Sequence, residues 1–121
     1  MPPDARRSLG AAGEVLAADR YVERGYQVLD RNWRCREGEL DLVLAGPGVV
    51  VFCEVKTRRS DAFGAPVEAI TPAKQRTLRT LALRWLADHP THRGRDLRFD
   101  VASVMAPWGR VASVEILEGA F

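Results

Sequence analysis

The spacing of apolar residues along the chain predicts two helices. Residues 7–24 repeat small and apolar side chains at a spacing of three and four, and Gly25 follows in the position of a C-terminal cap. The second helix is expected over residues 72–88, because Thr71 supplies an N-cap and Pro72 suits the first helical position. Its apolar stripe consists of Leu78, Leu81, Ala82, Trp85 and Leu86.

Shorter apolar runs predict strands between and after these helices. They cover residues 26–33, 39–45, 49–57, 97–105 and 110–117. Tight turns join the first three runs, so an antiparallel meander is expected there. Residues 58–70 are polar, hold Gly64 and Pro66, and predict an extended loop. The order α-β-β-β-α-β-β predicts an α/β (α+β) fold, with helices packed on the faces of a mixed sheet.

Charged residues enter two of these apolar strands. The third strand begins as a Val-Val-Val-Phe-Cys run, which is typical of a central strand buried on both faces. Glu54 and Lys56 follow, and residues two apart share a face with Cα atoms about 6.6 Å apart. Asp41 lies in the preceding strand, with Glu39 expected on its face. Burying such charges costs free energy unless they are paired or bind a metal ion.

Composition and charge change this picture little. A length of 121 residues suffices for a single domain, residues 1–121, in which we expect residues 1–6 to be disordered. The net charge of +2 indicates no partner by itself. Two scattered cysteines exclude a disulfide framework and a cysteine-rich zinc site. The sequence shows neither a signal peptide nor the ~18-residue apolar run of a membrane span, so we expect a cytoplasmic protein.

Seven short phrases, taken in order, point to a known group of proteins. They are Gly13-Glu14, Arg31-Asn32-Trp33-Arg34-Cys35-Arg36, Gly38-Glu39-Leu40-Asp41-Leu42, Glu54-Val55-Lys56-Thr57-Arg58, Phe63-Gly64, Lys74-Gln75 and Arg98-Phe99-Asp100-Val101. With these phrases the chain resembles the YraN family, small bacterial proteins assigned to the PD-(D/E)xK nuclease superfamily and likened to archaeal Holliday junction resolvases. The resemblance implies a restriction-endonuclease-like fold.

The resemblance also implies roles for individual residues. Asp41 matches the metal-binding aspartate of the second core strand, and Glu54 with Lys56 matches the acidic-x-lysine element of the third. Glu14 matches an acidic residue that the first helix contributes in resolvase-like members. One position departs from the motif, because Leu40 stands where a proline often precedes the aspartate.

These residue types suit metal-dependent phosphodiester hydrolysis. A divalent cation can activate water and stabilise charge on phosphate oxygens, and Mg²⁺ (or Mn²⁺) prefers oxygen ligands. Asp41 and Glu54 would supply carboxylates, and the main-chain carbonyl of Val55 would be a third ligand. Lys56 would hold the attacking water, and Glu14 would bind through water or a second metal ion. Without metal, one of these carboxyl groups should have a raised pKa.

The expected function is therefore that of a magnesium-dependent endonuclease acting on DNA, branched or single-stranded. The alternative is a catalytically silent module that keeps the fold and binds nucleic acid or another protein. In that case Glu54 and Lys56 form a same-face ion pair, and Glu14 is an exposed acid on a helix. Because the chain is small for an enzyme that spans a duplex, a homodimer is a further expectation.

Basic residues outside this constellation are candidates for contact with phosphates. They are Arg31, Arg34, Arg36, Arg58 and Lys74. Trp33 lies among three of these arginines, where it would either stack on a base or cover the edge of the sheet. His89 and His92 are expected to be solvent groups rather than ligands.

Three polar residues have two interpretations each. Glu39 would support the site or pair with Arg36 or Lys56. Asp100 is expected to pair with an arginine such as Arg98 rather than to bind metal. Gln75, like Lys74, would touch phosphate or orient Lys56, or else belong to a solvated first turn of the helix.

Overall fold

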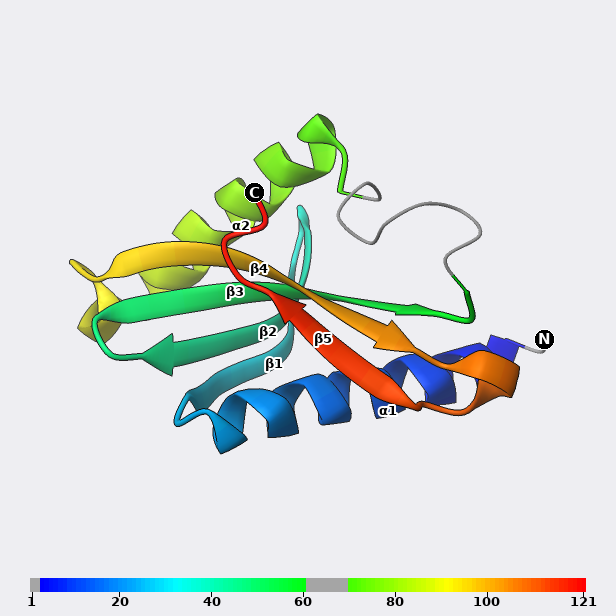
Figure 1. The fold of residues 1–121 in the computed structure, drawn as a ribbon. Helices are drawn as coiled ribbons and strands as arrows, with labels where there is room; N and C mark the ends of the chain where they lie inside the picture. Colours follow the sequence, from blue (N-terminus) through cyan, green and yellow to red (C-terminus); the bar gives the residue numbers. More distant parts are fainter. Residues whose placement is uncertain (1–2, 61–69) are drawn as a thin grey trace.

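The computed structural model describes residues 3–60 and 70–121, which form a sheet between two helices (Figure 1). The helices are α1 (Pro3–Glu23) and α2 (Pro72–Asp88). The strands are β1 (Gln27–Cys35), β2 (Gly38–Gly46), β3 (Val49–Arg58), β4 (Asp96–Met105) and β5 (Ser113–Leu117). Two short 3₁₀ helices, η2 (Pro90–His92) and η3 (Pro107–Gly109), precede and follow β4.

The sheet has the order β1-β2-β3-β4-β5 and is mixed. The first three strands form the expected antiparallel meander, and α2 crosses over so that β4 pairs parallel with β3. The last strand, β5, returns antiparallel to β4. The central strand β3 is buried from Val50 to Glu54, as its apolar run predicts.

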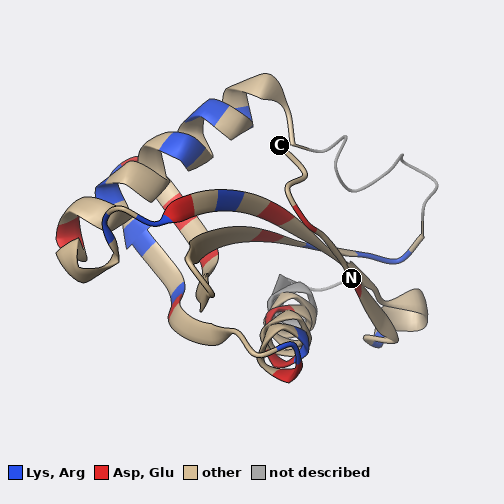
Figure 2. Cartoon of the chain, turned by 60° about the vertical axis from the view of Figure 1, so that its left-hand side comes forward, with Lys and Arg blue, Asp and Glu red and all other residues tan. Residues whose placement is uncertain are grey.

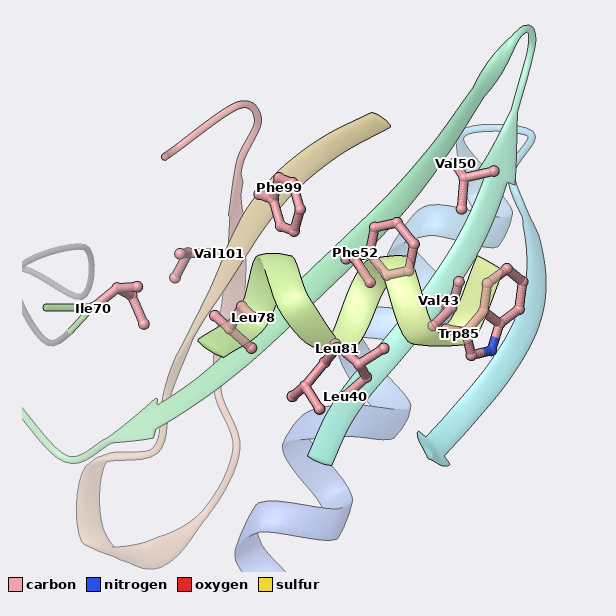
Figure 3. Packing of buried hydrophobic residues seen from close by; sticks show 11 residues of the cluster. Leu40, Val43, Val50, Phe52, Ile70, Leu78, Leu81, Trp85, Phe99 and Val101 are labelled. Carbon is pink, nitrogen blue, oxygen red and sulfur yellow. The ribbon is translucent and has the colours of Figure 1, made fainter. Parts of the chain in front are cut away.

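Each face of the sheet has its own hydrophobic core. The α2 face is built around Phe52, Leu81 and Trp85, and Figure 3 shows these side chains packed between the helix and the strands. The α1 face is built around Ala17, Tyr21 and Val51, so alternate residues of β3 belong to opposite cores. Small residues on α1 allow that helix to approach the sheet closely.

The structure follows the expected order of elements and differs at their ends. Helix α1 begins at Pro3 rather than Arg7, so the part of residues 1–6 that the structure describes is helical. Strand β5 begins at Ser113 rather than Arg110, because the chain first forms η3 and a short irregular connection. Most of the loop expected over residues 58–70 lies outside the described residues, and Arg58 itself still belongs to β3.

The arrangement is an α+β fold with two helices and a five-stranded mixed sheet, and it is consistent with a restriction-endonuclease-like architecture. Within residues 3–60 and 70–121, neither helix combines the length and apolar character needed to cross a membrane.

Candidate active site

The candidate site lies where strands β2 and β3 separate. Their pairing ends at Leu42 and Cys53, and beyond this point the Asp41 carboxylate accepts a hydrogen bond from the main-chain N–H of Val55 at 2.8 Å. Leu40 packs in the α2-side core whereas Leu42 packs in the α1-side core. Residues two apart on a regular strand share a face, so the regular alternation of side chains along β2 is interrupted at Asp41. This irregularity brings the Asp41 side chain into the gap between the strands.

Glu54 is the second carboxylate of the site, and it is only 8% exposed. Its Oε1 lies 3.9 Å from Nζ of Lys56, and its Oε2 lies 4.0 Å from Nζ of Lys74. Both distances exceed that of a good charged hydrogen bond. Oε2 is buried and has no hydrogen-bond partner among the described residues. The carboxyl group is therefore surrounded by cations but incompletely satisfied.

The pKa of Glu54 is raised to about 8. Burial is the largest cause, followed by the charge of Asp41 and a hydrogen bond that protonated Glu54 donates to Asp41. The ammonium groups of Lys74 and Lys56 oppose the shift. Asp41 and Glu54 therefore come together as expected, and one of the two has the raised pKa expected of adjacent carboxylates.

Glu14 reaches the same region from helix α1. Partial burial raises its pKa, a hydrogen bond with Asn32 lowers it, and the charges of Asp41 and Glu39 raise it further. The preceding residue, Gly13, is buried where α1 crosses the side chains of Thr57 on β3 and Val104 on β4. This close approach holds Glu14 near the strands that carry the other acids.

Two clefts meet at Glu14. The larger has a volume of about 570 Å³ and lies between the first half of α1 and the end of β3. Its lining is formed by Leu9, Gly10, Glu14, Val55, Thr57, Arg58 and Arg59. The smaller, of about 470 Å³, extends from Glu14 toward Asn32, Arg34 and Glu39. Among the residues that the structure describes, no three His, Cys, Asp or Glu side chains form a preassembled metal-binding group.

The candidate phosphate-binding residues do not form a single patch. Arg31, Arg34 and Arg36 are exposed around the end of β1, Arg58 lines the larger cleft, and Lys74 lies beside Glu54. Figure 2 shows basic residues along α2 and at several places on the sheet, interspersed with acidic ones. Within this set, the ammonium of Lys74 lies 4.0 Å from Oε2 of Glu54.

The structure shows contacts for three of the residues that have two interpretations. Glu39 accepts a hydrogen bond from Arg34 at 3.1 Å, a partner that was not expected. Gln75 donates to the carbonyl of Ile70 and so fixes the start of α2. Trp33 packs against the α2-side core, which confirms that it covers the edge of the sheet.

Asp100 pairs with Arg98, as expected, within a second polar cluster. It is fully buried and accepts two hydrogen bonds from Arg98, one from the Tyr21 hydroxyl and one from the main chain of Gly119. Arg98 also donates to the Tyr26 hydroxyl. This cluster is structural, because its donors and acceptors are satisfied within the protein.

The expectation for the two histidines needs correction, and the structure adds one residue to the site. His89 is not a solvent group, because its ring stacks on Trp85 with centroids 3.9 Å apart, and His92 lies 5.7 Å from the same ring. Sequence reasoning also missed Asn32, which bonds to Glu14 and adopts a positive φ of 50°. Asparagine tolerates that conformation better than most residues, but the apolar pattern of β1 gives no sign that it is needed.

The segment that contains these residues is similar in sequence to known proteins. The model of the uncharacterised protein family UPF0102 matches residues 13–104. A UPF0102 protein of Frankia alni is 50% identical over 121 residues, which cover all of both chains. UPF0102 proteins of Clavibacter michiganensis and Rhodococcus jostii are each 47% identical over 114 residues, covering 94% of this chain and 96% of each relative. The segment matched by the family model includes Glu14, Asp41, Glu54 and Lys56.

Proposed function

The chain belongs to the uncharacterised protein family UPF0102, the YraN family, and from this premise we propose that it is a metal-dependent nuclease that hydrolyses DNA phosphodiester bonds. One observation carries the proposal. The carboxyl groups of Asp41 and Glu54, from adjacent strands, lie together in a place where one carboxylate oxygen is buried without a hydrogen-bond partner among the described residues. Such an arrangement is costly in a purely structural role.

The residues present fit a hard divalent cation such as Mg²⁺ or Mn²⁺. Magnesium is usually held by one or two carboxylates, with water and substrate phosphate completing its coordination. Asp41 and Glu54 would supply the carboxylates, the main-chain carbonyl of Val55 would add an oxygen, and Glu14 would bind through water or a second ion. When bound, the cation would lower the pKa of a bound water and neutralise charge on the phosphate.

The remaining groups would position substrate and water. Lys56 lies 3.9 Å from Glu54 and is about one-third exposed, so its ammonium can face solvent and hold the attacking water. Lys74, at 4.0 Å from the other Glu54 oxygen, can contact a phosphate oxygen of the substrate. Asp41 is oriented by the Val55 N–H, which limits the rotation of its carboxylate.

The proposed substrate is DNA, branched or single-stranded, as the resemblance to Holliday junction resolvases suggests. Proposed phosphate contacts are Arg31, Arg34, Arg36 and Arg58. Of these, Arg58 lines the larger cleft at Glu14 and Arg34 lines the smaller one. A homodimer about a two-fold axis would allow so small a chain to act on two strands of a junction. Light scattering of the free and DNA-bound protein tests that part.

The nuclease proposal is tested by cleavage of single-stranded, duplex and four-way-junction DNA with Mg²⁺ or Mn²⁺. We expect wild type to cleave at least one substrate, and we expect Asp41→Asn and Lys56→Ala to lose at least 100-fold in rate. Asp19→Asn is the matched control, because Asp19 is exposed on α1 and should retain full activity. Equal rates for wild type and Lys56→Ala on every substrate would refute catalysis at this site.

A second candidate function follows from the contacts that already surround the two acids. Asp41 accepts from Val55, and Glu54 lies between Lys56 and Lys74, so the group has the partners of a structural ion cluster. The protein would then bind nucleic acid or another protein without cleaving it. Calorimetric titration with Mn²⁺ separates the two functions, because only the nuclease requires binding that Glu54→Gln abolishes.

A further inference from the structure

Trp108 is the most exposed large apolar residue that the structure describes. Its side chain is 94% exposed, whereas Trp85 is fully buried and Trp33 packs against the α2-side core. Trp108 also has φ 57° and ψ 26°, a left-handed conformation that bulky side chains rarely adopt. The left-handed backbone is unfavourable for a bulky residue, and strain of this kind is concentrated at functional sites.

The turn that carries Trp108 is held by hydrogen bonds on both sides. Gly109 N–H donates to the carbonyl of Ala106 at 3.1 Å, and Arg110 N–H donates to that of Pro107 at 3.3 Å. Ala112 N–H then closes the connection by donating to Met105 at 2.8 Å. Pro107 restricts the backbone angles before Trp108, and Gly109 allows a wider range of backbone angles after it. The ring is therefore presented on an ordered support.

This turn lies at the end of the strand that carries the candidate site. Arg58 pairs with Met105, and Ala106 N–H donates to the carbonyl of Arg58 at 2.7 Å. Glu54 is four residues back along the same strand, which corresponds to about 13 Å at ~3.3 Å per residue. Figure 1 shows η3 at the end of the sheet where β3 ends and α1 begins.

Two arginines neighbour the turn along the backbone. Arg59 follows the end of β3 and Arg110 follows the turn, and both are exposed. Arg58 and Arg59 also line the 570 Å³ cleft that leads to Glu14 and Val55. An aromatic platform flanked by cations is the combination that binds single-stranded nucleic acid, since the bases stack on the ring and the phosphates meet the cations.

We propose that Trp108 stacks on an unpaired base of a single-stranded segment whose phosphates pass over Arg59 and Arg110 toward the Asp41–Glu54 site. The direction of the strand rests on the proposed nuclease function, whereas the stacking itself does not. A duplex has no unpaired base to offer, so the platform selects single-stranded or unstacked DNA. The proposed substrate is thereby narrowed from DNA in general to DNA with an unpaired segment beside the cleavage point.

The test measures binding of a short oligothymidylate in EDTA, where cleavage cannot occur. We expect Trp108→Ala to weaken binding roughly five- to 150-fold, the range of base–aromatic stacking, and Trp108→Phe to retain most of the affinity. Leu83→Ala is the matched control, because Leu83 is a 64% exposed apolar residue on α2 and should bind as wild type. Oligothymidylate should quench tryptophan fluorescence in wild type and much less in Trp108→Phe.

Trp108→Gly guards against a change in folding, since glycine accepts the φ of 57° without strain. It should be at least as stable as wild type and bind as weakly as Trp108→Ala. The inference is overturned if wild type does not bind the oligonucleotide, or if Trp108→Ala or Trp108→Gly binds it as wild type does. It is also overturned if Phe and Ala lose affinity equally, or if duplex binding falls by the same factor. Absence of cleavage by wild type, with the stacking results as expected, would refute the nuclease and leave this inference standing.

Discussion

At the scale of single residues, Glu54 combines deep burial with incomplete satisfaction. Its Oε2 has no hydrogen-bond partner in the described part of the chain, and neither neighbouring lysine is closer than 3.9 Å. Folding therefore favours the protonated acid, and the pKa of Glu54 is raised to about 8. The folded protein is more stable when the Glu54 carboxyl group is uncharged than when it is ionised. The presence of an acid at this position therefore has a reason other than stability.

This raised pKa predicts a stability that falls as pH increases. The ordinary pKa of the group is 4.5 and the folded value is about 8, so its contribution is complete below pH 4.5 and is lost as pH rises toward 8. Within that window the free energy of unfolding of the metal-free protein should decrease by up to ~1.4 kcal/mol per pH unit. Urea unfolding in EDTA at several pH values measures the slope.

Glu54→Gln supplies the comparison for that slope. The amide cannot ionise, so the variant should show a flatter pH profile and should be more stable than wild type at pH 8. Glu115→Gln, an exposed acid on β5, should keep the wild-type slope. A wild-type profile as flat as that of Glu54→Gln would show that Glu54 folds without an excess proton.

Strand periodicity explains which site residues the sequence could reveal. Glu54 and Lys56 interrupt a regular, buried strand, so their shared face follows from counting by two. The bond from Val55 to Asp41 could not be predicted, because it exists only where β2 departs from that periodicity. Asn32 was missed for the same reason, since its positive φ marks an irregularity of β1 that no apolar pattern encodes.

At the scale of elements, the position of helix α1 depends on one glycine. A Cβ on Gly13 would collide with Oγ1 of Thr57 and lie 3.4 Å from Cγ1 of Val104. Val104 is buried and Thr57 is half-buried, and both are β-branched, so their side chains have few rotamers available. The helix that carries Glu14 is therefore placed by the absence of a side chain on the preceding residue.

Gly13→Ala should destabilise the protein by about 1–3 kcal/mol, although alanine is the better helix former. Gly10→Ala is the matched control, because a Cβ there meets no described atom within 4 Å. That control should gain up to about 1 kcal/mol from helix propensity. Chemical denaturation of both variants measures the difference.

A second substitution tests the cause of the Gly13 effect. Thr57→Ala removes the oxygen that the new Cβ would meet, so the double variant Gly13→Ala/Thr57→Ala should recover part of the lost stability. Strictly additive losses in the double variant would mean that the contact with Thr57 is not the cause.

The elements themselves were predicted more completely than their ends. Helix α2 begins and ends where expected because Thr71 caps it and Pro90 follows it, and both signals are local. Strand β5 was expected three residues too early, since the η3 turn takes its shape from hydrogen bonds to Ala106 and Pro107 rather than from side-chain pattern. The predicted α-β-β-β-α-β-β order is correct because it depends on the periodicity of apolar residues over whole segments.

At the scale of the whole molecule, two buried acids on neighbouring strands have opposite surroundings. Asp100 accepts bonds from Arg98, Tyr21 and Gly119, and so joins β4 to α1 and to the segment after β5. Within residues 3–60 and 70–121, one oxygen of Glu54, on the adjacent β3, has no such partner. The fold thus keeps one fully satisfied carboxylate as a structural junction and one incompletely satisfied carboxylate beside the clefts.

This contrast predicts opposite effects for the same chemical change. Asp100→Asn replaces an acceptor of charged hydrogen bonds with a group that also donates, so it should cost about 2–4 kcal/mol of stability at pH 8. Glu54→Gln should raise stability under the same conditions. Asp100→Asn should leave Mn²⁺ binding intact, because Asp100 belongs to the structural cluster. Glu54→Gln should abolish Mn²⁺ binding, because Glu54 belongs to the proposed metal site. Urea unfolding and calorimetry on the two variants measure both quantities. If both substitutions lowered stability and left Mn²⁺ affinity intact, Glu54 would be a structural acid like Asp100, and the division between a structural and a functional cluster would be wrong.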